Sequence, residues 1–174
     1  MSVPYISLYF ESTFGLTYDI YSGYSFLAYG LVLILILFAP SIKNRFGLKY
    51  SIPATQLLSV GCLSTLALMD IYNGWNWALS VALIAFIFRQ PLMNIAQPLT
   101  TEVIMKYVGK TNHEVTASLM ALIWNGSFVF SSLVFSSLRD RNISYAGIFS
   151  ITVVMYLIAI VWYQRLIVRT EKMD

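Results

Sequence analysis

The sequence predicts an all-α protein, a polytopic transmembrane helix bundle with five full spans and a partial N-terminal one. The chain is 58% hydrophobic and only 11% charged, whereas soluble domains carry about a quarter charged residues. Its mean hydropathy is +0.71. A chain of 174 residues cannot hide so much apolar surface in one core, because a small domain leaves a large area exposed. We therefore expect lipid as its solvent.

The apolar residues gather in five runs, each near the roughly 20 residues that cross a bilayer core. The runs are residues 20–42, 51–69, 77–97, 115–138 and 146–164. Within lipid each must be a helix, because no water is present to bond exposed backbone groups. The runs are too long for barrel strands and lack their alternation of apolar and polar residues.

The two ends of the chain differ from the runs. Residues 1–19 are apolar and aromatic, but Glu11 interrupts them and the apolar part is only about half a span. We expect the outer end of a helix whose beginning is missing, or an interfacial segment. Residues 20–164 form the predicted five-span bundle, and residues 165–174 a cytoplasmic tail.

Basic residues favour one side of the predicted membrane, eight against two, with Arg89 inside it. The positive-inside rule places that side in the cytoplasm. We expect a multi-pass protein of a plasma or inner membrane with a cytoplasmic C-terminus. The net charge of +3 is too small and scattered to indicate a nucleic-acid partner. The eight residues are Lys43, Arg45, Lys49, Lys106, Lys110, Arg165, Arg169 and Lys172.

Arg89 is the sharpest candidate for function. It lies 12 residues past Trp77, about 18 Å along a helix and close to the midplane. A charge at this depth costs at least about 2.5 kcal/mol, so it should face a cavity or a partner. One interpretation is a helix that lines a polar substrate path, which we favour. The other is a structural Arg that pairs with a helix-end carbonyl or a carboxylate.

The same helix carries further polar residues on one side of Arg89. Pro91 and Pro98 interrupt its hydrogen bonding, which membrane helices tolerate where the backbone lines a cavity. At 100° per residue the polar side chains fall within one arc, about 80° to 140° from Arg89. They are Gln90, Asn94, Gln97 and Thr101.

Trp124 and Asn125 lie about ten residues into the fourth run, again near mid-depth. Asn125 could bond a substrate or another helix, since amides join helices in membranes. We favour the interhelical role for Asn125.

Residues for other chemistry are lacking. His113, the single His, has no second ligand at metal spacing, so we predict no metal site and no cofactor. The sequence contains no Walker A loop, zinc-protease pair or nucleophile elbow. These absences argue against an ATP-driven pump and against an intramembrane enzyme. Glu11 is best interpreted as facing the outer mouth of the bundle rather than as a proton carrier.

Four motifs in order resemble the C-terminal half of major facilitator superfamily transporters. The first is PY at residues 4–5 with YF at 9–10 and FGL at 14–16, similar to the end of the seventh helix of that family. The second is RFG at residues 45–47 after Pro40, similar to the loop between its helices eight and nine. The third is RQPLMN at 89–94 with Pro98, and the fourth is Glu114 with ASL at 117–119 and WN at 124–125.

The resemblance covers nearly the whole chain and implies alternating access about a central site. It implies that Met1 falls within helix seven and that an N-terminal six-helix half is missing. It also implies a small-molecule substrate, bound by Arg89, Gln90, Asn94, Gln97, Trp124 and Asn125. The chain departs from the family at residues 115–116, where Val-Thr replaces the usual Arg-Gly. The alternative is a non-transporting remnant or subunit that acts by helix association.

Overall fold

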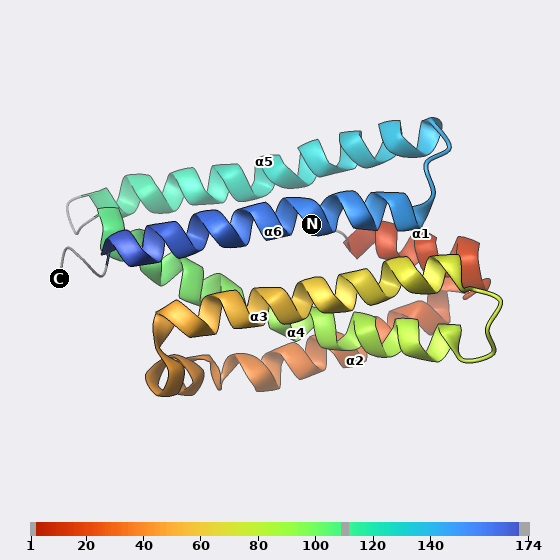
Figure 1. Ribbon diagram of the computed structural model, residues 1–174, viewed down its shortest axis with the longest axis horizontal. Helices are drawn as coiled ribbons and strands as arrows, with labels where there is room; N and C mark the ends of the chain where they lie inside the picture. The colour runs from red at the N-terminus through yellow and green to blue at the C-terminus, as the bar shows by residue number, and fades with distance from the viewer. Residues whose placement is uncertain (1–2, 109–111, 171–174) are drawn as a thin grey trace.

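The computed structural model describes residues 3–108 and 112–170 of the chain. In these residues it is entirely α-helical apart from turns, with no strand. Five of its helices are long and apolar enough to cross a membrane, which confirms the predicted all-α bundle of five spans after a shorter helix (Figure 1). The helices are α1 (Val3–Phe14), α2 (Tyr18–Ile36), α3 (Ala39–Ile71), α4 (Ala78–Val108), α5 (His113–Asp140) and α6 (Tyr145–Thr170).

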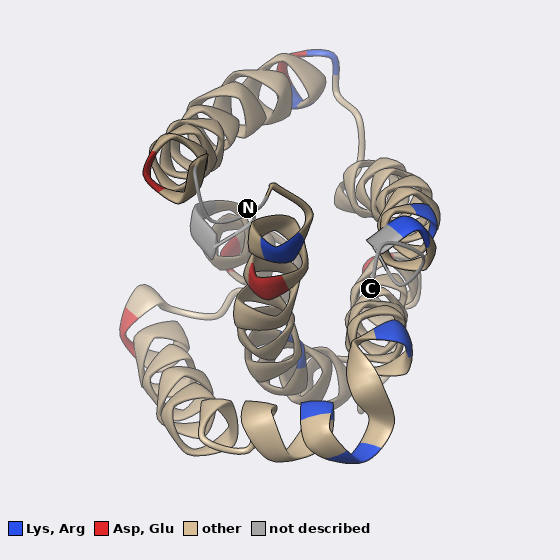
Figure 2. Cartoon of the chain, turned by 90° about the vertical axis from the view of Figure 1, so that its left-hand side faces the viewer, with Lys and Arg blue, Asp and Glu red and all other residues tan. Residues whose placement is uncertain are grey.

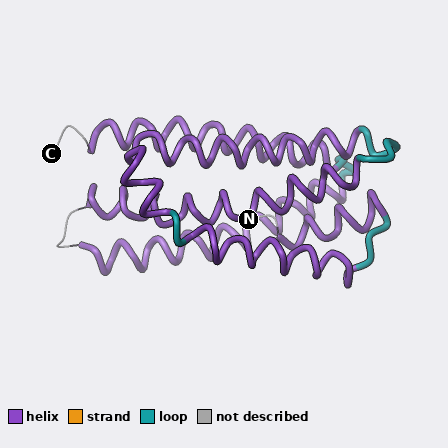
Figure 3. Tube along the Cα trace, turned by 90° about the horizontal axis from the view of Figure 1, so that it is seen from below, coloured by secondary structure: helices purple, strands orange, loops and turns teal. Residues whose placement is uncertain are grey.

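The long helices run side by side along the molecule (Figures 1 and 3). The connections α1–α2, α3–α4 and α5–α6 lie at one end, and the α2–α3 connection lies at the other, where α4 ends and α5 begins. Figure 2 looks onto the second end, where Lys and Arg residues of α3, α4 and α6 gather. The segregation of basic residues expected from the loops is therefore present in the fold.

Several helix ends differ from the apolar runs. The first run was predicted to continue to residue 42, but α2 ends at Ile36 and α3 begins at Ala39. Pro40 explains the break, since proline fits the first turn of a helix and disrupts a helix interior. Within α3, Gly47 has φ 71° and ψ 164°, which kinks the helix after its basic first segment. Glycine adopts this positive φ without the strain that a side chain would cause.

The other helices extend beyond the predicted spans. α4 continues to Val108, and α6 continues to Thr170, so residues 165–170 of the predicted tail are helical. Polar residues at these ends can stay helical outside the lipid core, because the backbone bonds are internal to the helix. Residues 171–174 lie outside the described residues.

The α1 helix is packed inside one half of the bundle. Ile6, Tyr9 and Phe10 have no exposed surface. The Phe10 ring lies 5.8 Å from the ring of Phe86 on α4, and the Tyr9 ring lies 5.2 Å from the ring of Phe149 on α6, centroid to centroid. Leu8 on the same helix is 46% exposed, so α1 contributes one face to the core.

Polar interactions join helices at both ends of the bundle. The Asp70 carboxylate accepts bonds from the Thr13 hydroxyl (3.1 Å) and the Ala146 backbone N–H (2.8 Å), joining α1, α3 and α6. At the basic end, Lys43 of α3 pairs with Glu102 of α4 at 2.6 Å. This second pair is about one-third exposed and contributes less than about 1 kcal/mol.

The α5 helix is the least packed of the long helices. Helix α3 packs along α4 and α6, and α2 along α4. By contrast, Phe135 is the one residue of α5 that is buried in the described structure. Much of the α5 surface is therefore available to lipid or to another chain.

Candidate functional site

Arg89 and Gln90 are buried in the middle of α4. The exposed fraction of Arg89 is 2% and that of Gln90 is 5%. Arg89 is the twelfth of the 31 residues of α4. It lies between two apolar clusters, because Phe86 belongs to the cluster around α1 and Ile95 to the cluster at the basic end. Arg89 therefore lies near the middle of the length of the bundle.

The groups that interact with the Arg89 guanidinium come from three other helices. Tyr156 of α6 forms a side-chain hydrogen bond with it, and Cys62 of α3 and Tyr21 of α2 interact with it electrostatically. Phenols and thiols are neutral at physiological pH. Within residues 3–108 and 112–170, no carboxylate forms an ion pair with Arg89. In the part of the chain that the structure describes, the buried positive charge thus has a hydrogen-bonding neighbour and no counter-ion.

Two buried N–H donors at this point have no acceptor. Among the described residues, neither the Nε of Arg89 nor the Nε2 of Gln90 has a hydrogen-bond partner. A buried donor without a partner costs about 1–3 kcal/mol. Most buried polar groups in proteins are bonded, so two adjacent exceptions beside an uncompensated charge indicate a place for an acceptor.

The α4 backbone is weakened on both sides of Asn94. Pro91 and Pro98 have no N–H, so the carbonyls of Ile87 and Asn94 lack their helical partners. The Asn94 amide bonds its own helix, with its Nδ2 donating to the Gln90 carbonyl at 2.8 Å. A helix with two such interruptions bends more readily than a continuous one.

The polar arc predicted on α4 begins inside the bundle and ends on its surface. Gln90 is buried, Asn94 is half-buried and Gln97 is exposed. The Gln97 carbonyl accepts hydrogen bonds from the hydroxyls of Thr100 and Thr101, at 2.8 and 3.0 Å. The side chains thus form a polar track along one helix, from mid-depth towards the basic end.

Trp124 and Asn125 lie apart from Arg89. Both are exposed on α5, Trp124 by 46%. Asn125 Nδ2 donates to the Ala121 carbonyl of its own helix at 2.9 Å, and the Trp124 ring packs edge-on against Phe128 at 5.6 Å. In the described part of the chain, no hydrogen bond or ring contact joins either residue to Arg89 or to another helix. The six predicted residues therefore do not form one closed site in this bundle.

Sequence reasoning missed the groups around Arg89. Tyr156 lies eleven residues after the start of α6, and Arg89 lies eleven residues after the start of α4. Equal depth in two helices that start at the same end of the bundle is a signal that could have found Tyr156, although it does not say which helices are neighbours. Cys62 lies near the middle of its apolar run, residues 51–69, which is a weaker signal of the same kind.

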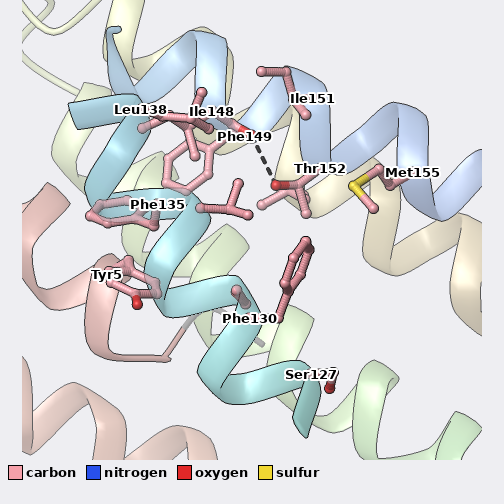
Figure 4. Close-up of a pocket in the computed structure, with 13 residues that line it drawn as sticks. Tyr5, Ser127, Phe130, Phe135, Leu138, Ile148, Phe149, Ile151, Thr152 and Met155 are labelled. Atoms are coloured by element: carbon pink, nitrogen blue, oxygen red, sulfur yellow. Dashed lines mark hydrogen bonds between the residues drawn. The ribbon is translucent and has the colours of Figure 1, made fainter. Parts of the chain in front are cut away.

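A mainly apolar cavity of about 180 Å³ lies between α1, α3, α5 and α6 (Figure 4). The Thr152 hydroxyl in its lining donates to the Ile148 carbonyl at 2.9 Å, the bond drawn in Figure 4. The cavity can therefore accept hydrocarbon and offers little to a charged group. Its walls include Tyr5, Phe130, Phe135, Phe149 and Met155.

Metal-binding chemistry has no visible basis in the described ranges, where no three His, Cys, Asp or Glu residues cluster. Comparison of the chain with protein-family models, with curated proteins and with solved structures gives no match.

Proposed function

We propose that this chain is part of a secondary active transporter that moves a small solute across a cell membrane by alternating access. In this proposal it supplies a C-terminal bundle of the major facilitator type, and a second six-helix bundle completes the central site. The observation that carries the proposal is Arg89, a buried cation near the middle of α4 that has, among the described residues, no counter-ion and an unpaired donor.

An arginine with a purely structural role would be expected in different surroundings from those of Arg89. Its charge would be balanced by a carboxylate, because an unpaired charge in low dielectric is costly. Arg89 instead forms a hydrogen bond with the neutral Tyr156, on a helix interrupted by Pro91 and Pro98. Such interruptions suit a helix that bends between two states while lining a polar path.

The distribution of basic residues supports an orientation. Lys43, Arg45, Lys49 and Lys106 lie at the end of the bundle where α6 also ends. The positive-inside rule assigns this end to the cytoplasm. The proposed location is the plasma or inner membrane with a cytoplasmic C-terminus.

Water access along α5 and α4 tests the proposal without knowledge of the substrate. In a Cys62→Ser background, Asn125→Cys and Gln97→Cys should react with a membrane-impermeant maleimide added to either side of sealed vesicles. Ile123→Cys is the matched control, because it is exposed and lies about 160° around α5 from Asn125. It should face lipid and stay unlabelled. Equal labelling of Ile123→Cys and Asn125→Cys, or access from one side only, would contradict alternating access.

The exposed surface of α5 favours a second candidate, a subunit that acts by helix association without transport. Asn125 is an exposed amide on a helix with one buried residue, and an amide in lipid favours a partner helix. In that case Asn125→Cys would resist water-soluble maleimide and form a crosslink with another chain.

A further inference from the structure

We propose that Arg89 and Gln90 form a binding site for a negatively charged group, such as a carboxylate, phosphate or sulfonate, on the carried solute. This inference rests on the transport function proposed above and names the chemical class of its substrate. It depends on the charge balance around Arg89 and on the donors that the fold leaves without acceptors.

The charge balance selects an anion. The buried guanidinium interacts electrostatically with Tyr156, Cys62 and Tyr21, none of which carries a negative charge at physiological pH. A neutral solute would leave this charge uncompensated, and a cationic solute would add repulsion in a low-dielectric site. A solute with a negative group gains the full attraction, because no carboxylate within the described ranges competes for Arg89.

The free donors fit the same ligand. Arg89 Nε and Gln90 Nε2 both lack acceptors in the described structure, and the two residues are consecutive on α4. A carboxylate or phosphate offers several acceptor oxygens, and a guanidinium presents its N–H groups in a planar fork that matches them. Charged hydrogen bonds of this kind are about twice as strong as neutral ones.

Access to the site requires the helices to part. Arg89 is 2% exposed, so an anion reaches it when α4 moves relative to α2, α3 and α6. Pro91 directly follows the two donors, and Pro98 lies seven residues further along α4. The helix can therefore bend next to the site. The closed bundle thus holds the donors away from water, and its opening offers them to a solute.

Binding can be measured on the purified chain in phosphatidylcholine nanodiscs, with tryptophan fluorescence reporting thermal unfolding. The probes are succinate and inorganic phosphate, with neutral succinamide and cationic 1,4-diaminobutane as size-matched controls for succinate. Succinate or phosphate at a hundredfold excess over its Kd should raise the Tm by about 5 °C or more. Succinamide and 1,4-diaminobutane should leave it unchanged.

Variants assign the effect to the site. Arg89→Gln should abolish the shift, whereas Arg45→Gln, an exposed arginine at the end of the bundle, should keep it. Arg89→Lys keeps a charge without the planar fork and should weaken binding about tenfold. It also serves as the test variant if Arg89→Gln does not fold. A shift that persists in both Arg89 variants, or an equal shift with succinamide, would overturn the proposal.

The source of the anion and the transport function are tested separately. A Tm increase that depends on Arg89 and appears only in phosphatidylglycerol nanodiscs would assign the anion to a lipid headgroup and overturn the carried solute. An Arg89-dependent shift with succinate but no two-sided access at residue 125 would retain the anion site and reject alternating access. Two-sided access with no anion-dependent shift in either lipid would retain alternating access and reject the anion site.

Discussion

Replacing Arg89 by methionine should stabilise the unliganded protein. The substitution keeps an unbranched side chain of similar length and removes the charge. A central arginine costs about 2.5–3.5 kcal/mol on insertion scales, and loss of its charged hydrogen bond to Tyr156 returns about 1.5–3 kcal/mol. The midpoints of these two ranges give a net gain of about 1 kcal/mol, since no ion pair of Arg89 within the described residues is lost. For a chain of this length that gain raises the Tm by about 2–4 °C.

The assay is thermal unfolding of wild-type and Arg89→Met proteins in the same nanodiscs without added carboxylate or phosphate. A higher Tm together with loss of the succinate-dependent shift would identify Arg89 as a residue kept for function at the expense of stability. A Tm lower by 3 °C or more would refute the reasoning. It would show that the guanidinium holds α4, α3 and α6 together and that the charge is compensated.

Three other predictions concern the fold and its orientation. Asp70→Ala should destabilise the bundle by about 1–3 kcal/mol, because it leaves the Ala146 N–H without its acceptor, and Asp70→Asn should recover part of the loss in the same melting assay. Phe10→Ala should cost about 3–5 kcal/mol, since its ring is fully buried; a loss below 1 kcal/mol would show that α1 is not part of the core. Cysteines at Lys49 and Asn73 should react with impermeant maleimide from the cytoplasm and from outside respectively, and the reverse pattern would overturn the orientation.

Composition and periodicity predict the fold class because lipid imposes a simple rule on the chain. A run of about 20 apolar residues in a bilayer forms a helix whatever its neighbours are. The ends of the helices are harder to predict, because hydropathy identifies the residues within the lipid core and a helix can extend beyond that core. Residues 98–108 and 165–170 are helical although polar residues interrupt their hydropathy. Pro40 predicts a break in the helix near the end of α2, but the apolar run from residue 20 to 42 was defined by hydropathy and continues past this proline.

The candidate site was only partly predictable. A charge in an apolar run identifies Arg89 by itself, and helical spacing places Gln90 and Asn94 beside it. The contact with Tyr156 depends on α6 packing near α4, which no local pattern encodes. Exposure of Trp124 and Asn125 depends in turn on the loose packing of α5, and no local pattern predicts that either.

Counterflow of radiolabelled succinate and phosphate into proteoliposomes, compared between wild type and Arg89→Met at equal amounts of folded protein, tests the central claim most directly. If the chain alone does not form a working transporter, the partner bundle must be reconstituted in the same vesicles. The account predicts flux in the wild type, background flux in Arg89→Met and unchanged flux in Arg45→Gln. Equal flux in wild type and Arg89→Met would contradict it, because the buried arginine would then play no part in moving the solute.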